Sequence, residues 1–188
     1  MTSRIVFLDR DGVLNAVCVD PEHGTIDSPL HPSQVEVFPW VPDALATIAG
    51  LGYALAIVTN QPAAAKGKTT EKNLADVHAR IVEVAQSAGA VIRSSQICLH
   101  RSEDGCACRK PKPGMLETAF RALGGKTKED LWMVGDGVTD VEAGARFGAK
   151  TAFLGPRKCD ACKILESRSL TPTFWGKDLK AFADHLAR

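Results

Sequence analysis

Short apolar runs alternate with amphipathic stretches along this 188-residue chain, and this alternation limits the possible folds more than any other feature. The apolar runs lie at residues 5–8, 53–59, 96–99, 131–134 and 150–154. Together they are rich in Val, Ile and Leu on both faces, which is typical of parallel strands covered by helices. We therefore predict a doubly wound, Rossmann-like α/β fold, with one domain spanning residues 1–188.

Helices are predicted between these strands. The segments with a helical pattern are residues 41–52, 69–89, 113–125 and 139–149. The clearest is 69–89, in which Thr69 or Thr70 can cap the start and Gly89 follows the end. Its apolar positions recur on one stripe of the helix. They are Leu74, Val77, Ile81, Val84 and Ala85.

Polar residues gather directly after four of the predicted strands. Asp9 and Asp11 follow the first strand, residues 59–61 the second, residues 98–112 the third and residues 136–140 the fourth. In a parallel sheet these segments all lie at the carboxyl ends of the strands, where α/β proteins bind their ligands. The pattern therefore predicts a functional site at one rim of the sheet.

Four aspartates at this rim would bring like charges together: Asp9, Asp11, Asp136 and Asp140. Crowded carboxylates are costly unless a cation compensates them. Mg²⁺ prefers oxygen ligands and leaves positions open for water and phosphate, so we expect Mg²⁺ here. Any single aspartate could instead merely cap a helix, because Asp is a favoured N-cap residue. Four on one rim favour the metal site.

Thr59 and Lys110 belong to the same rim. The threonine offers a hydroxyl group, and the lysine offers a mobile positive charge, for a phosphoryl group held against the metal. The expected chemistry is therefore phosphoryl transfer.

The segment "ICLHRSEDGCACRKPKPG" carries a second metal pattern. Cys98 and His100 are spaced C-x-H, and Cys106 and Cys108 are spaced C-x-C. Three thiolates and one imidazole make a closed tetrahedral zinc site, which staples a loop and performs no chemistry. Ordinary buried thiols beside a surface histidine are the alternative, but the loop is too polar for a core. The loop runs directly into Arg109, so we expect the zinc to fix the cations beside it.

Four motifs in order resemble those of the haloacid dehalogenase superfamily of phosphatases: "FLDRDGVLN", "VTNQ", "CRKPKPG" and "GDGVTD". The resemblance covers residues 4 to 154. It implies that Asp9 is the nucleophile, which forms an aspartyl-phosphate, and that Asp11 protonates the leaving oxygen and then deprotonates water. Thr59 and Lys110 would hold the transferring phosphoryl oxygens.

The same resemblance implies a set of Mg²⁺ ligands. They would be Asp9, the backbone carbonyl of Asp11, and Asp136. Asp140 would either contact the metal through a water or orient another group of the site.

The zinc loop resembles one branch of the superfamily, which contains D-glycero-D-manno-heptose 1,7-bisphosphate 7-phosphatases and histidinol-phosphate phosphatases. "DRDGVLN" and "CRKPKPGM" are closer to the heptose enzymes, whereas the short zinc loop is closer to the histidinol-phosphate enzymes. Pro62 and Ala63 replace a small polar pair, Lys66 stands where the heptose enzymes have Arg, and Gly137 where some have Lys. We expect the heptose bisphosphate as substrate, with histidinol phosphate as the alternative.

Substrate contacts beyond the transferred phosphate are expected from five residues: Asn15, Asn60, Gln61, Lys66 and Arg109. The segment 16–34 is long enough for a loop but not for a cap domain, so the site should be capless and open. His23 and His31 in this loop could touch substrate or be solvated.

Composition argues against other classes of function. With 23 Lys and Arg against 22 Asp and Glu, the net charge is +1, which gives no reason to expect nucleic acid as a partner and disfavours a nucleic-acid 3′-phosphatase. A non-catalytic zinc-binding module is disfavoured because Asp9, Asp11 and Asp136 are all present. No apolar run could span a membrane or serve as a signal peptide, so we expect a cytoplasmic protein. We expect a monomer, because a capless phosphatase of this kind has no evident apolar patch for a dimer. Cys159 and Cys162 are interpreted as incidental thiols.

Overall fold

The computed structural model describes residues 4–20, 25–87 and 89–188, and its centre is a six-stranded parallel sheet. The strands run in the order β5-β4-β1-β6-β7-β8, so β1 lies in the middle. The chain adds β4 and β5 on one side of β1 and then returns to add β6, β7 and β8 on the other. This is the predicted doubly wound arrangement, and its switch point lies beside β1.

Four of the predicted strands agree with the structure to within one residue at each end. They are β1 (Arg4–Leu8), β4 (Ala54–Asn60), β6 (Asp130–Gly135) and β7 (Lys150–Leu154). The prediction for β5 was wrong at its start, since the strand spans Ile92–Cys98. It begins in "IRSS" because β5 is an edge strand, and its partly exposed faces accept polar side chains.

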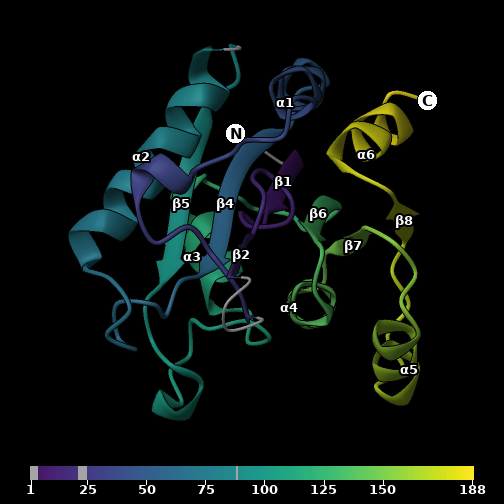
Figure 1. Cartoon of the computed structure of the whole chain (residues 1–188). Helices are drawn as coiled ribbons and strands as arrows, with labels where there is room; N and C mark the ends of the chain where they lie inside the picture. Colours follow the sequence, from purple (N-terminus) through teal and green to yellow (C-terminus); the bar gives the residue numbers. More distant parts are fainter. Residues whose placement is uncertain (1–3, 21–24, 88) are drawn as a thin grey trace.

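Helices cover both faces of the sheet, and each face has its own apolar core. Side chains of β1 alternate between them: Val6 and Leu8 pack toward α1 (Val41–Gly50), α2 (Glu71–Ser87) and α6 (Leu179–Leu186). Ile5 and Phe7 pack toward α3 (Gly114–Ala122) and α4 (Val138–Phe147). Figure 1 shows α1 and α6 on one side of the row β1, β6, β7 and β8, with α4 and α5 (Cys159–Ser167) on the other.

The helix predicted from residues 69–89 is present as α2. Thr70 caps it, since its hydroxyl oxygen accepts a hydrogen bond from the amide of Asn73 at 3.1 Å. Leu74, Val77, Ile81 and Ala85 are buried as expected, whereas Val84 lies at the margin of the stripe and is only half-buried.

Several short elements were not predicted. The segment after β1 was expected to be a loop, but it contains the antiparallel strands β2 (Cys18–Asp20) and β3 (Thr25–Asp27) and a 3-10 turn, η1 (Pro32–Gln34). A second 3-10 turn, η2 (Ser102–Asp104), lies after β5. The C-terminal part adds α5, α6 and the edge strand β8 (Phe174–Gly176). Strands of three residues carry too little pattern to be recognised from sequence.

Within the described ranges, none of the helices combines the length and the apolar character that crossing a bilayer would require.

Close packing of α4 on the sheet gives a first prediction. A Cβ added to Gly144 would lie 2.7 Å from both Met133 Cβ and Thr151 Cγ2, which are fixed to β6 and β7. Gly144→Ala should therefore lower the free energy of unfolding by about 1–3 kcal/mol, the usual cost of overpacking. Urea denaturation measures the change.

The matched control is Gly50→Ala at the end of α1, where a Cβ would meet nothing within 4 Å. This variant should be as stable as the wild type or slightly more stable. Equal effects of the two substitutions would contradict the close contact between α4 and the sheet.

Candidate active site

The chain turns sharply after β1, and this turn places the first two aspartates. Asp9 still follows the line of the strand, because its amide donates to the carbonyl of Val134 at 2.9 Å. Gly12 has a φ of +80°, a left-handed conformation that a side chain disfavours. A Cβ at this glycine would also lie 2.1 Å from Oδ2 of Asp136. Gly12 thus allows both the turn and the close approach of Asp136.

Lys110 occupies the centre of the site and is only 2% exposed. Its Nζ lies 2.9 Å from Asp9 Oδ1 and 2.6 Å from Asp140 Oδ1, and it donates to the carbonyl of Val58 at 2.9 Å. Burial alone would lower the pKa of Lys110, but the charges of Asp140 and Asp9 outweigh burial and raise it. The expectation of a mobile charge was therefore wrong: three contacts hold the ammonium in place.

Asp140 lies in the first turn of α4 and contacts two neighbours. Its Oδ2 accepts a hydrogen bond from the amide of Gly137 at 3.0 Å, while Oδ1 faces Lys110. Burial raises the pKa of Asp140 to about 7, and the charge of Lys110 works against that rise. Of the two roles considered for Asp140, these contacts favour the orientation of Lys110.

Arg10, which the sequence analysis did not single out, is fully buried against Asp11. Its Nε and Nη2 donate to Oδ1 and Oδ2 of Asp11 at 3.2 and 3.1 Å. Burial alone would raise the pKa of Asp11, but Arg10 and hydrogen bonds from Asn15 and Gln61 hold it below its usual range. The sequence signal that could have identified Arg10 is its position: a positive charge between two aspartates, directly after an apolar strand.

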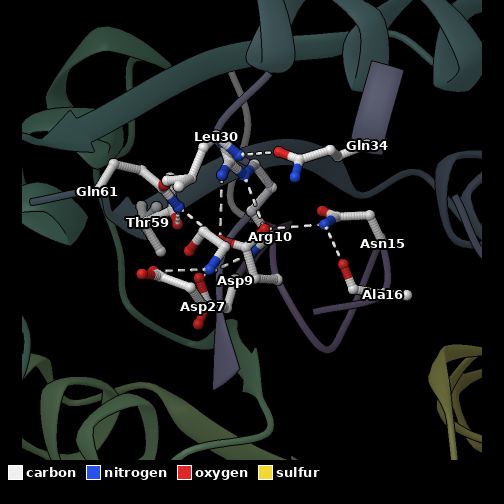
Figure 2. Close-up of polar contacts among 12 residues, drawn as sticks. Asp9, Arg10, Asn15, Ala16, Asp27, Leu30, Gln34, Thr59 and Gln61 are labelled. Atoms are coloured by element: carbon white, nitrogen blue, oxygen red, sulfur yellow. Dashed lines mark hydrogen bonds and ion pairs between the residues drawn. The ribbon is translucent and has the colours of Figure 1, made fainter. Parts of the chain in front are cut away.

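Asn15 and Gln61 were expected to contact substrate, but both are fully buried and face Asp11. The amide of Asn15 donates to Asp11 Oδ1 at 2.8 Å, and that of Gln61 donates to Asp11 Oδ2 at 2.6 Å. In Figure 2 the two amides approach the region of Arg10 from opposite sides. Both residues therefore have a different role from the expected one, because their donors are used inside the protein.

Asn60 also makes an internal contact rather than pointing outward. Its Nδ2 donates to the carbonyl of Lys110, and its Oδ1 accepts from the amide of Lys110, both at 3.1 Å. This pair of hydrogen bonds joins the end of β4 to the backbone of Lys110. The residue thus fixes the lysine that faces Asp9.

The remaining predicted substrate contacts, Lys66 and Arg109, lie nearer the surface than Thr59, which was expected to hold the phosphoryl oxygens. Lys66 is exposed, and Arg109 is half-buried, with Nη1 donating to the carbonyl of His100 at 3.2 Å. Thr59 is buried, and its hydroxyl oxygen accepts from Gln61 Nε2 at 2.9 Å. His31 caps the turn η1 through Ser33, and His23 lies outside the described residues.

Oxygen atoms of Asp9, Asp136 and Asp140 lie within 4.8 Å of one another. Asp136 is exposed on one side, but the protein around it still reduces the solvation of its carboxylate. This loss of solvation and the charge of Asp9 raise the pKa of Asp136 to about 6. With Asp11, four carboxylates face the two buried cations Arg10 and Lys110, so two negative charges are uncompensated. A hard divalent cation has the matching charge and prefers oxygen donors, so the donor set fits Mg²⁺.

The Cys/His residues predicted to bind zinc come together at the end of β5. Sγ of Cys108 lies 3.3 Å from Cys98 Sγ, 3.4 Å from Cys106 Sγ and 3.3 Å from His100 Nδ1. Burial and the neighbouring thiols raise the pKa of Cys108 to about 12. Ligands at about 2.3 Å from a tetrahedral zinc would be about 3.8 Å apart. The distances between the ligand atoms here are slightly shorter, so a small outward movement of the side chains would make room for the ion.

Backbone contacts connect this cluster to the aspartate site. The carbonyl of Cys98 accepts from the amide of Gln61 at 2.7 Å, and Gln61 in turn holds Asp11. Lys112 Nζ donates to the carbonyls of Gly105 and Cys106 at 2.6 and 2.8 Å. The cluster therefore fixes the segment that carries Lys110.

Comparisons with known proteins show which proteins this chain is similar to. A model of the haloacid dehalogenase-like hydrolases matches residues 28–148. A D-glycero-beta-D-manno-heptose-1,7-bisphosphate 7-phosphatase of Neisseria meningitidis is 33% identical over 80% of this chain and 76% of its own. The bifunctional histidine biosynthesis protein HisB of Legionella pneumophila is 30% identical over 77% of this chain and 39% of its own.

A solved structure of a D,D-heptose 1,7-bisphosphate phosphatase from B. bronchiseptica, complexed with magnesium and phosphate, is similar along nearly the whole chain. It has a TM-score of 0.80 and 27% identity, and the match covers 98% of each chain. The fold predicted from sequence is therefore that of a solved phosphatase.

The position of Lys110 gives a second prediction. Lys110→Met removes the charge that Asp9 and Asp140 share, and breaking a buried pair on one side costs about 3–5 kcal/mol. Urea denaturation in the presence of a chelator should show a loss of stability of that size.

Lys72→Met is the matched control, since the Lys72–Asp76 ion pair is exposed on α2. It should change stability by less than about 1 kcal/mol. Equal losses in the two variants would contradict a central role for Lys110 in the buried network.

Proposed function

This chain belongs to the haloacid dehalogenase-like hydrolases, and from that premise we propose that residues 1–188 form one phosphatase domain. Its reaction is the Mg²⁺-dependent hydrolysis of a small phosphorylated metabolite through an aspartyl-phosphate. The observation that carries the proposal is the pairing of each aspartate in the first motif with its own buried cation. Asp9 lies beside Lys110, and Asp11 beside Arg10.

Asp9 is the nucleophile in this proposal. One carboxylate oxygen attacks phosphorus, the Asp9 O–P bond forms, and the bond from phosphorus to the leaving oxygen breaks. Asp9 Oδ1 already accepts from the amide of Arg10 at 2.7 Å and lies beside Lys110. These contacts fix its orientation, so that Oδ2 is the oxygen that can attack.

Asp11 moves the proton. It gives a proton to the leaving oxygen in the first step and takes one from water in the second, when water attacks the aspartyl-phosphate. The donors around Asp11 favour its ionised form, as the base role in the second step requires. The negative charge of an arriving phosphate opposes that effect, because like charges disfavour ionisation.

Asp9, the backbone carbonyl of Asp11, and Asp136 would hold Mg²⁺ in this proposal. The ion, when bound, would neutralise charge on the phosphoryl oxygens and orient them for in-line attack. Asp140 keeps Lys110 directed at the same oxygens, and Thr59 offers a hydroxyl group to them. Asn60 supports this arrangement through the backbone of Lys110.

The substrate that we propose is D-glycero-D-manno-heptose 1,7-bisphosphate, which loses its 7-phosphate. The heptose-bisphosphate phosphatases among the relatives support it, and so does the match to the solved heptose-bisphosphate phosphatase along 98% of this chain. Arg109 and Lys66 remain the candidates for contacts to the rest of the substrate, since neither is buried.

Histidinol phosphate is the second candidate substrate. The short loop between His100 and Cys106 and the similarity to HisB of Legionella pneumophila favour it. This chain spans about two fifths of that bifunctional protein, so the likeness concerns one part of it.

Phosphate release from a small panel of substrates tests the proposal. The panel contains both anomers of the heptose 1,7-bisphosphate, histidinol phosphate and a 3′-phosphorylated oligonucleotide, each assayed with Mg²⁺. We expect the highest kcat/KM with a heptose bisphosphate and no turnover by Asp9→Asn. A preference for histidinol phosphate would overturn the substrate, and turnover by Asp9→Asn would overturn the mechanism.

A structural zinc ion at Cys98, His100, Cys106 and Cys108 gives a further prediction. Cys108→Ser should contain less zinc per chain and should lose activity, because the segment that carries Lys110 loses its anchor. Cys162→Ser in α5 is the matched control, and it should keep the zinc content and the activity of the wild type. Full activity of a zinc-free protein supplied with Mg²⁺ would contradict the anchoring role.

A further inference from the structure

We propose that Arg10 is a positioning residue, which holds the proton-transferring Asp11 in place with the help of Asn15 and Gln61. The proposal rests on the function proposed above, because it concerns the step that Asp11 performs. Its basis is a juxtaposition: a fully buried guanidinium and two fully buried amides converge on one carboxylate that is itself partly accessible.

The guanidinium holds both oxygens of Asp11 at once. Nε donates to Oδ1 at 3.2 Å and Nη2 to Oδ2 at 3.1 Å, so the planar groups lie side by side. A two-pronged contact of this kind fixes the rotation of a carboxylate as well as its place, which a single ammonium cannot do. Arg10 therefore determines which way the edge of Asp11 faces.

The two amides add one donor to each oxygen. Asn15 Nδ2 reaches Oδ1 at 2.8 Å, and Gln61 Nε2 reaches Oδ2 at 2.6 Å. Asn15 is anchored by a second hydrogen bond to the carbonyl of Ala16, and Gln61 by one to Thr59. Asp11 thus has four donors that come from three different positions in the chain, which leaves little freedom for another rotamer.

A separate cation for Asp11 also protects the neighbouring contacts. Asp9 and Asp11 lie two residues apart, and Lys110 already faces Asp9 and Asp140. An Asp11 without its own counter-charge would be attracted to Lys110 or to a divalent ion at the rim. Arg10 removes that competition, so Lys110 remains beside Asp9 and Asp11 keeps its own position.

A purely structural role for Arg10 makes a different prediction from a positioning role. If Arg10 only stabilises the fold, its loss should affect all substrates alike. If it positions Asp11, its loss should matter most where the leaving group needs a proton. Sugar phosphates have poor alkoxide leaving groups that need a proton, whereas the 4-nitrophenolate of 4-nitrophenyl phosphate departs without being protonated.

The experiment compares Arg10→Met with the wild type on two substrates. These are 4-nitrophenyl phosphate and an alkyl phosphate that the wild type hydrolyses. We expect kcat/KM to fall by about 10- to 100-fold for the alkyl phosphate and only a few-fold for the aryl phosphate, because a misplaced proton donor costs about that much. Equal losses on both substrates would overturn the proposal.

A double-mutant cycle tests whether Arg10 acts through Asp11. In an Asp11→Asn background, Arg10→Met should change the residual kcat/KM of the alkyl phosphate by less than about threefold, since no acid is left to position. A loss as large as in the wild-type background would overturn the proposal.

Arg10→Lys serves if Arg10→Met fails to fold, because it keeps the buried charge and loses the two-pronged contact. It should show the same selective loss on the alkyl phosphate, and an equal loss on both substrates would again contradict the proposal. A wild type that hydrolyses no alkyl phosphate would instead contradict the proposed function, so the two failures are distinguishable.

Discussion

The buried ammonium of Lys110 is the contact on which the rest of the site depends. It joins three parts of the chain that are distant in sequence: Asp9 after β1, the Val58 carbonyl in β4 and Asp140 at the start of α4. Because a buried charge without a partner is costly, the loss of any one of these contacts would destabilise the rim. The contact that joins the carboxyl ends of the central strands β4, β1 and β6 therefore also aims the cation at the nucleophile.

The two buried cations of the site pair with different aspartates. Lys110 forms ion pairs with Asp9 and Asp140, while Arg10 forms one with Asp11. Asp136 has no cation among these contacts, and the two negative charges that remain are those that a divalent ion would balance. This division explains how two aspartates two residues apart can have different tasks: their environments differ, although their side chains are identical.

Most of the fold could be predicted, because its central strands and its longest helix have recognisable apolar patterns in the sequence. Buried parallel strands such as β1, which is apolar from Ile5 to Leu8, can be recognised in the sequence, whereas the edge strand β5 and the three-residue strand β8 cannot. The site aspartates, Lys110 and the Cys/His cluster were recognisable by residue type and spacing. The side-chain directions of Asn15 and Gln61 were not, because both amides point to Asp11, whose position beside the buried Arg10 only the folded chain determines.

The stereochemistry at phosphorus tests most directly whether Asp9 bonds to phosphorus. A substrate made chiral at the phosphoryl group with oxygen isotopes and sulfur would be hydrolysed in isotopically labelled water, and the configuration of the released thiophosphate determined. Attack by Asp9 inverts phosphorus once, and attack by water on the aspartyl-phosphate inverts it again, so the account predicts net retention. Net inversion would mean that water attacks the substrate directly, and that Asp9 only holds the metal.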